Sequence, residues 1–254
     1  MDISRAKGIA VNDSVDLEQW RAAQVWEHDF WIRQQKNLAK FGKNHIWRVL
    51  AALGMVEAYR GDDHNQWWAS CFDNYRFLPS EVDNAIEVGC GPYTNMRLVR
   101  KACAPAHLVL SDPLIRTYAR FKMTFVNEMY REASCYLDDH PLEDTPFKSD
   151  YFDLAVMLNV LDHVQDANAC MRSLTRIVKP GGIVIIGQDL TDEEDLLTHP
   201  EGMRTGHPIT LDNEWFCPQL ERDFSPLIWK TLPRSAGRTP HWHSGTLLFA
   251  GTKK

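Results

Sequence analysis

Apolar residues recur at helical spacing in the first part of the chain and in short runs in the rest, and the change falls near residue 82. In the first part they lie three or four residues apart, or at sums of these spacings, on one face of a helix: Trp20, Ala23, Trp26, Phe30 and Trp31. Asp16 and Gln19 are a cap and its N3 partner for this helix, and a second helix is predicted over residues 44–59. Residues 1–82 are therefore predicted to form a helical, aromatic-rich cap, and residues 83–254 the main domain.

The aromatic side chains of this cap have two interpretations. They dock the helices on the main domain, or some of them line a substrate cleft. A helical cap is a common roof for a binding site, so both interpretations stay open at this point.

From residue 84 onward, short apolar runs alternate with helical segments. Strands are predicted over residues 85–88, 107–110, 134–137, 152–158 and 183–186, and helices over residues 93–102, 113–130 and 165–178. Such alternation is typical of an α/β fold with a parallel sheet and right-handed crossovers. Residues 227–232 and 246–251 are strand-like with no room for a crossover helix between them, which predicts an antiparallel pair at one sheet edge.

The turn after the first predicted strand carries the candidate chemistry. It reads Glu87-Val-Gly-Cys-Gly-Pro-Tyr-Thr-Asn, and two glycines one residue apart let the backbone turn sharply and approach a ligand. A dinucleotide-binding loop would have a third glycine where this chain has Thr94. Asp112 ends the second strand and is well placed to accept hydrogen bonds from two ribose hydroxyls.

With these residues in order, the chain resembles the class I S-adenosylmethionine-dependent methyltransferases, in particular their small-molecule, type 11-like members. The matching segments are the acid-x-G-x-G loop at 87–91, Asp112, the Pro-Phe and Phe-Asp pairs within 146–154, the Asn-Val-Leu-Asp-His-Val segment at 159–164 and the Leu…Val-Lys-Pro-Gly-Gly run at 174–182. The resemblance implies a Rossmann-like, doubly wound, seven-stranded sheet, mostly parallel, with an antiparallel final strand. It also implies methyl transfer from S-adenosylmethionine to a hydroxyl or amine of a small molecule such as a sugar or secondary metabolite.

The resemblance also assigns the cofactor-binding residues. Glu87 would orient the methionine amino group, the glycines would pass beneath the cofactor, and Asp112 would hold the ribose. The full implied set is Glu87, Gly89, Cys90, Gly91, Asp112, Asp139, Leu142 and Asn159. Near the adenine, Asp138, Asp139 and Glu143 could each be the family's acid, and Tyr93 replaces the family's third glycine.

Three residues on loops after the strands are candidate general bases: His163, Asp189 and His207. A hydroxyl acceptor would benefit from such a base, whereas an amine needs less help if it arrives neutral. Two further imidazoles, His241 and His243, have no third ligand nearby in sequence, so no metal site is expected.

Composition limits the partners. Over 254 residues, 44% are hydrophobic and 24% charged, which excludes a disordered chain. The net charge of −6 and the lack of a Lys/Arg block argue against nucleic acid. No apolar run approaches the ~20 residues of a membrane helix, no signal peptide is visible, and the six scattered cysteines favour a reducing, cytoplasmic location. A small-molecule acceptor is expected, and a homodimer is the oligomeric state considered. A protein methyltransferase and a cofactor-binding pseudo-enzyme are the alternatives.

Overall fold

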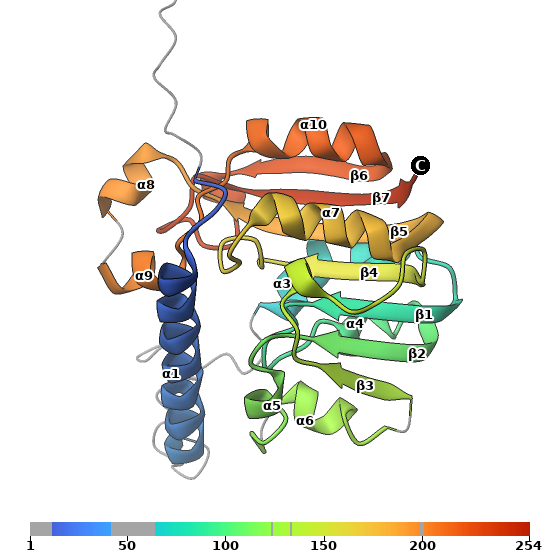
Figure 1. Cartoon of the computed structure of the whole chain (residues 1–254), viewed down its shortest axis with the longest axis horizontal. Helices are drawn as coiled ribbons and strands as arrows, with labels where there is room; N and C mark the ends of the chain where they lie inside the picture. Colours follow the sequence, from blue (N-terminus) through green and yellow to red (C-terminus); the bar gives the residue numbers. More distant parts are fainter. Residues whose placement is uncertain (1–11, 42–63, 123, 133, 199–200) are drawn as a thin grey trace, which may run out of the picture.

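A computed structural model describes residues 12–41, 64–122, 124–132, 134–198 and 201–254. Its centre is a seven-stranded sheet in the order β3-β2-β1-β4-β5-β7-β6 (Figure 1). The strands are β1 Glu81–Val88, β2 Ala104–Ser111, β3 Cys135–Asp138, β4 Phe152–Leu158, β5 Val178–Leu190, β6 Phe224–Pro233 and β7 Gly245–Lys253. The first five run parallel to one another, and β7 runs antiparallel to both β5 and β6. The predicted fold class and the antiparallel pair at one edge are therefore confirmed.

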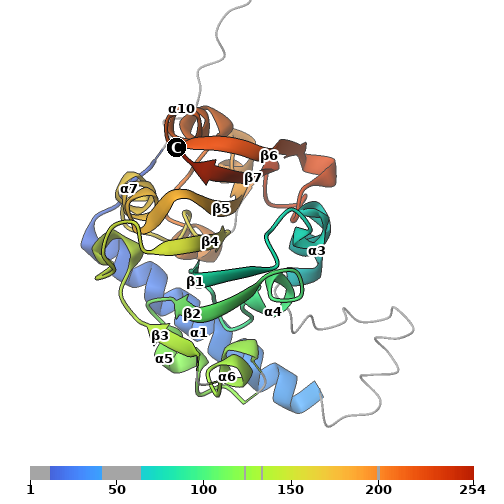
Figure 2. The ribbon, with the colours of Figure 1, turned by 90° about the vertical axis from the view of Figure 1, so that its right-hand side faces the viewer.

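The helices lie on both faces of the sheet and along one edge. They are α1 Leu17–Phe41, α3 Asn65–Cys71, α4 Met96–Val99, α5 Ile115–Tyr118, α6 Phe125–Met129, α7 Ala167–Ile177, α8 Glu193–Thr198, α9 Glu201–Gly206 and α10 Asn213–Asp223. Figure 2 shows α7 on one face and α3 and α4 on the other. Figure 1 shows α1 standing beside α9 at the carboxyl ends of the parallel strands.

Alternating side chains of the central strands supply two apolar cores, one on each face. Ala85 of β1 belongs to the core that contains Trp68 and Met96. Its neighbour Ile86 belongs to the other core, with Met171 of α7. Because both faces are covered, the central strands read as continuous apolar runs in the sequence.

Two predicted helices are wrong in extent. The helix expected over residues 113–130 is two short helices, α5 and α6. Thr124 separates them, because its hydroxyl accepts a bond from the Asn127 amide at 3.2 Å and donates to the Phe121 carbonyl at 3.0 Å. Such side-chain bonds to the backbone compete with a continuous helix.

The N-terminal prediction is confirmed where it can be compared. Helix α1 begins after Asp16, whose carboxylate accepts a 2.8 Å bond from the Gln19 amide. The helix expected over residues 44–59 lies outside the described residues. Among the described helices, none is long and apolar enough to cross a membrane, and the cysteines at positions 71, 90, 103, 135, 170 and 217 are free thiols.

Glu87 explains why the helix expected over residues 93–102 begins only at Met96, as α4, which ends at Val99. Its buried carboxylate accepts bonds from the backbone amides of Asn95, at 2.9 Å, and Met96, at 3.2 Å, and also from the Thr94 hydroxyl. Residues 94 and 95 are therefore held in a turn that ties the end of β1 to the first turn of α4. Burial raises the pKa of Glu87 to about 7, although these hydrogen bonds lower it.

We expect the Glu87→Ala variant to lose about 2–4 kcal/mol of unfolding free energy, because removing the carboxylate leaves several buried donors without an acceptor. Urea denaturation measures the loss. Glu81→Ala, at the exposed start of the same strand, is the matched control and should change stability by less than about 0.5 kcal/mol. Equal stability of the two variants would contradict the structural role of Glu87.

Candidate functional site

A cavity of about 230 Å³ opens at the carboxyl ends of β1, β2 and β4. Open α/β sheets bind their ligands at this edge. Its floor is made by the loops that follow these strands, and α1 roofs it. Its lining includes Trp20, Trp26, Glu27, Phe30, Trp31, Trp68, Gly89, Cys90, Gly91, Asp112, His140, Leu142, Glu143, Asn159, His163, His207 and Arg238.

The glycine loop turns back on itself beneath the cavity. Gly89 and Gly91 have φ values of +59° and +54°, in the left-handed region that favours glycine. A Cβ on Gly89 would lie 2.4 Å from Val160, whereas one on Gly91 would meet nothing within 4 Å. The first glycine therefore permits close packing of two loops, and the second leaves open space for a ligand. Burial raises the pKa of the intervening Cys90 well above its usual value, so this side chain is a neutral thiol.

Asp112 faces this loop from the end of β2. Its carboxylate accepts 3.1 Å and 2.8 Å bonds from the backbone amides of Gly91 and Leu114. Burial raises its pKa to about 6, and the two amide bonds oppose that shift. Each carboxylate oxygen still has acceptor capacity toward the cavity, as a ribose diol requires.

The three acids considered for the adenine end lie in different environments. Asp138 is buried and accepts a 2.9 Å bond from the Ser111 hydroxyl. Asp139 does not line the cavity and is paired with Arg116 on the surface. Glu143 lines the cavity together with Leu142, while its carboxylate accepts a 2.9 Å bond from the Gln165 amide.

Two other predicted cofactor residues differ in their position: Glu87 lies behind the glycine loop, and Asn159 lines the cavity. Glu87 is not among the lining residues; it supports the glycine loop from behind through Asn95 and Met96. Asn159 does line the cavity, and its backbone has a φ of +57° at the end of β4. Its side-chain oxygen accepts a 3.2 Å bond from the Asp189 amide, which holds this turn against β5.

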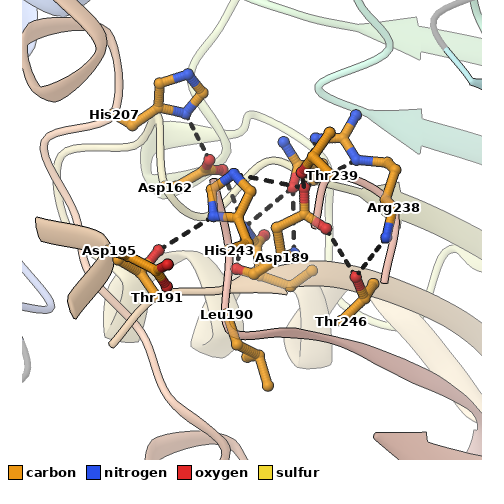
Figure 3. Close-up of polar contacts among 12 residues, drawn as sticks. Asp162, Asp189, Leu190, Thr191, Asp195, His207, Arg238, Thr239, His243 and Thr246 are labelled. Atoms are coloured by element: carbon orange, nitrogen blue, oxygen red, sulfur yellow. Dashed lines mark hydrogen bonds and ion pairs between the residues drawn. The ribbon is translucent and has the colours of Figure 1, made fainter. Parts of the chain in front are cut away.

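His163 and His207 come together in the lining of the same cavity. Their ring centroids are 4.3 Å apart, and Asp162 lies 2.7 Å from the Nδ1 atom of His207. Figure 3 shows the contact between Asp162 and His207. The pKa of Asp162 lies well below its usual value, because the attraction of both imidazoles and the bond with His207 outweigh the effect of burial. Burial lowers the pKa of His163, but Asp162 and the Glu27 carboxylate raise it to a net value above the ordinary one.

The carboxylate of Asp189, the third candidate base, is bound by neighbouring side chains of the fold. Its carboxylate lies 2.7 Å from an Nη of Arg238 and accepts a 2.9 Å bond from the Thr246 hydroxyl (Figure 3). It does not line the cavity, and its pKa is lowered because the attraction of Arg238 and His243 outweighs burial. Burial in turn lowers the pKa of His243. The structure therefore brings His163 and His207 together and leaves Asp189 apart from them.

The aromatic residues of α1 contribute to the cavity. Trp20, Trp26, Phe30 and Trp31 line it. The rings of Trp26 and Phe30 are stacked with centroids 5.4 Å apart, and Trp26 also contacts the His207 ring edge-on at 5.8 Å. The same face therefore packs α1 on the rest of the chain and lines the cavity, and its contact with a substrate stays a prediction.

Sequence reasoning did not single out Asp162, Gln188, Glu27 or Arg238. Asp162 immediately precedes His163 in the turn that follows β4, so its place beside a candidate base was a usable signal. Gln188, which donates a 3.0 Å bond to Asp162, had only its place at the end of a strand to mark it. Glu27 and Arg238 come from segments far from the motifs, and nothing in their spacing indicates that they meet the cavity.

Residues 86–186, from β1 to β5, match the family model described as a methyltransferase domain. A comparison with curated proteins finds no match. Among solved structures, the [4+2]-cyclase SpnF is similar at a TM-score of 0.60 and 15% identity, over 98% of this chain and 99% of that chain. The N-methyltransferase NodS from Bradyrhizobium japonicum WM9, in complex with S-adenosylhomocysteine, is similar at a TM-score of 0.56 and 15% identity, over 87% of this chain and 98% of that chain.

A third similar structure is geranyl diphosphate C-methyltransferase from Streptomyces coelicolor A3(2), with a TM-score of 0.57 and 11% identity, over 74% of this chain and 76% of that chain. At such identities the structural likeness shows the fold. The glycine loop and the strand-ending acid Asp112 both lie within the matched segment. Residues 86–186 are therefore identified as a methyltransferase domain, which is the class expected from the sequence.

The two glycines of the loop should respond differently to alanine. Gly91→Ala should weaken S-adenosylhomocysteine binding while costing only about 1 kcal/mol of stability, because its Cβ enters open space. Gly89→Ala should destabilise the fold more strongly, since its Cβ collides with Val160. Calorimetric titration and thermal melting distinguish these effects. An unchanged affinity of Gly91→Ala would place the ligand elsewhere.

Cofactor affinity should depend on pH through Asp112. Its pKa is about 6, so the carboxylate is ionised above that pH and loses acceptor capacity below it. The dissociation constant for S-adenosylhomocysteine should be flat at pH 7–8 and rise about tenfold at pH 5. Titrations across this range check the slope, with Asp112→Asn as a weak, pH-independent reference. A flat wild-type profile would contradict the contact.

Proposed function

We propose that this protein transfers the methyl group of S-adenosylmethionine to a hydroxyl or amine of a small molecule such as a sugar or secondary metabolite. One observation carries the proposal: a single cavity is lined by the glycine loop and Asp112, by two imidazoles and by the aromatic side chains of α1. The glycine loop and Asp112 have the hydrogen-bonding groups that a nucleoside needs. The imidazoles and aromatic rings have the proton-accepting groups and apolar surfaces that a methyl acceptor needs.

The glycine loop and Asp112 fit the cofactor. Asp112 would accept hydrogen bonds from the ribose hydroxyls, and the backbone of the 89–91 loop would lie beneath the cofactor. Leu142 offers an apolar surface to the adenine ring, and Glu143 is favoured over Asp139 as the nearby acid because only Glu143 lines the cavity. Asn159 would bound the site on the β4 side, and Glu87 would act through the loop that it supports.

The cofactor supplies an already activated sulfonium methyl, so the chain must chiefly bring the acceptor atom in line with the carbon–sulfur bond. The aromatic side chains of α1 restrict that approach. Trp26, Phe30 and Trp31 present ring surfaces to the cavity, which suits a ring-shaped acceptor. His163 and His207 are the groups that can receive or position the acceptor's proton, whereas Asp189 is committed to Arg238.

The roof favours a small molecule over a macromolecule. Helix α1 and His207, which directly follows α9, lie over the cavity, so an extended protein or nucleic-acid substrate would have to pass them. The net charge of −6 also disfavours nucleic acid. A cytoplasmic location, a homodimer and the division at residue 82 remain predictions.

A second candidate is cofactor binding without methyl transfer. The similarity to a [4+2]-cyclase over nearly the whole of both chains favours keeping it. The two functions differ in one observable: both bind S-adenosylhomocysteine, and only the first produces it from S-adenosylmethionine when an acceptor is present.

In calorimetric titrations, we expect the wild-type chain to bind S-adenosylhomocysteine with micromolar affinity and to show no binding of NADH. Asp112→Ala should weaken binding by about 2 kcal/mol or more, because it removes charge-assisted hydrogen bonds to the ribose. Asp139→Ala is the matched control, since this acid lies on the surface beside Arg116, and it should bind like the wild type.

A screen of hydroxylated sugars and aromatic metabolites for S-adenosylhomocysteine production then tests turnover. Production with one acceptor supports the methyltransferase. Binding without turnover across the screen would favour the second candidate. Equal binding by the Asp112→Ala and wild-type chains would refute the ribose contact.

A further inference from the structure

Three side chains at the cavity form a cluster of metal-ligating types: His163 and His207, which line it, and the adjacent Asp162. Asp162, His163 and His207 each offer one ligand atom, and these atoms all lie within 4.8 Å of one another. The cluster joins neighbours at the end of β4 to a residue that follows α9, more than 40 positions later in the chain. The sequence contains no motif with metal-ligand spacing that would predict this cluster.

The separations between the ligand atoms lie on either side of the value expected around a single ion. Asp162 Oδ2 lies 2.7 Å from His207 Nδ1 and 3.8 Å from His163 Nε2. Two ligands held about 2.1 Å from a tetrahedral ion lie about 3.4 Å apart, between these two values. Small side-chain rotations would therefore bring the three atoms around one ion. His207 would then carry its proton on Nε2 and present Nδ1 as the ligand.

The partners of these side chains orient them as metal ligands are commonly oriented. His163 Nδ1 lies 2.8 Å from the carbonyl of Gly206, so a proton on Nδ1 leaves the Nε2 lone pair directed at Asp162. The other oxygen of Asp162 accepts a 3.0 Å bond from the Gln188 amide. Metal-bound histidines usually donate their second ring nitrogen to a carbonyl or carboxylate in this way, and metal-bound carboxylates are hydrogen-bonded in turn.

The surroundings favour a cation. The carboxylate of Glu27 lies 3.9 Å from His163, and Asp112 and Glu143 line the same cavity. The guanidinium of Arg238 is already paired with Asp189. With that proton on Nδ1, the Nε2 lone pair of the half-buried His163 lies 3.8 Å from Oδ2 of the buried Asp162. Two such acceptors need a positive species between them, either a proton or a metal ion.

We propose that Asp162, His163 and His207 bind one divalent first-row transition-metal ion, such as Zn²⁺ or Fe²⁺, with its open positions directed into the cavity. Two imidazoles and one carboxylate select this class of ion over Mg²⁺ and Ca²⁺, which prefer oxygen ligands. The binding site stands on its own geometry. Its use, to coordinate an acceptor oxygen beside the transferred methyl, rests on the proposed function.

Cobalt(II) tests the proposal directly, because the visible absorption of the ion reports nitrogen ligands. The full chain, purified without a histidine tag and treated with chelator, should bind one equivalent of Co²⁺ with a visible spectrum. Zn²⁺ should displace it and Mg²⁺ should not. Because the wild-type chain alone gives this result, its failure to bind Co²⁺ overturns the proposal whatever happens to any variant.

Variants locate the site. His163→Ala and His207→Ala should each lower Co²⁺ affinity by at least about 100-fold, since each removes one ligand. His241→Ala, an exposed imidazole outside the lining of the cavity, is the matched control and should bind like the wild type. Circular dichroism confirms that each variant is folded. Equal Co²⁺ binding by the His207→Ala and wild-type chains overturns the assignment.

Titration with S-adenosylhomocysteine on the same samples distinguishes this proposal from the proposed function. Cofactor binding without Co²⁺ binding overturns the metal site and leaves Asp162 and His207 as a hydrogen-bonded pair that acts without metal. Co²⁺ binding without cofactor binding supports the metal site and counts against the methyltransferase.

Discussion

The parallel order of β2, β1, β4 and β5 determines where everything else in this protein lies. Parallel strands end at the same edge of the sheet, so each of them delivers its last residues to one place. The glycine loop, Asp112, Asn159 and Asp189 all come from that edge. The buried carboxylate of Glu87 then fixes the sharp turn after β1 by accepting amide bonds at the start of α4. Without that turn the glycine loop would have no defined path beneath the cavity.

Two glycines let the walls of the cavity close. A Cβ on Gly206 would lie 2.2 Å from the Trp26 ring, and one on Gly187 would lie 2.4 Å from the Trp68 ring. Residue 206 therefore has no side chain where α9 meets α1, and the imidazole of the next residue, His207, reaches the cavity. The roof, the imidazole pair and the aromatic surfaces are consequences of this close approach. They enclose a site rich in carboxylates, as a cationic cofactor requires.

The sequence predicted the parts of this site that lie on one strand or one turn. Glycines one residue apart, a strand-ending acid and continuous apolar runs are local signals, and Gly89, Gly91, Asp112 and the central sheet follow from them. Helix lengths were predicted less well. A side chain that caps or breaks a helix, as Thr124 does, uses bonds that periodicity does not report.

Contacts between distant segments could not be predicted. Arg238 meets Asp189 across 49 positions, and His207 meets Asp162 across 45, so only the folded chain reveals them. For the same reason, the sequence did not show that Asp189, a candidate base, is paired with Arg238. Nor did it show that Asp162 contacts His207. Asp139 and Glu143 were equivalent in sequence and differ in the structure because only one of them faces the cavity.

A crystal structure of the chain with S-adenosylhomocysteine tests the central claim most directly. The account predicts both ribose hydroxyls within hydrogen-bond distance of Asp112, the methionine end above the glycine loop, and the sulfur directed toward His163 and His207. Adenosine bound away from Asp112, or a sulfur directed away from the two imidazoles, would contradict it.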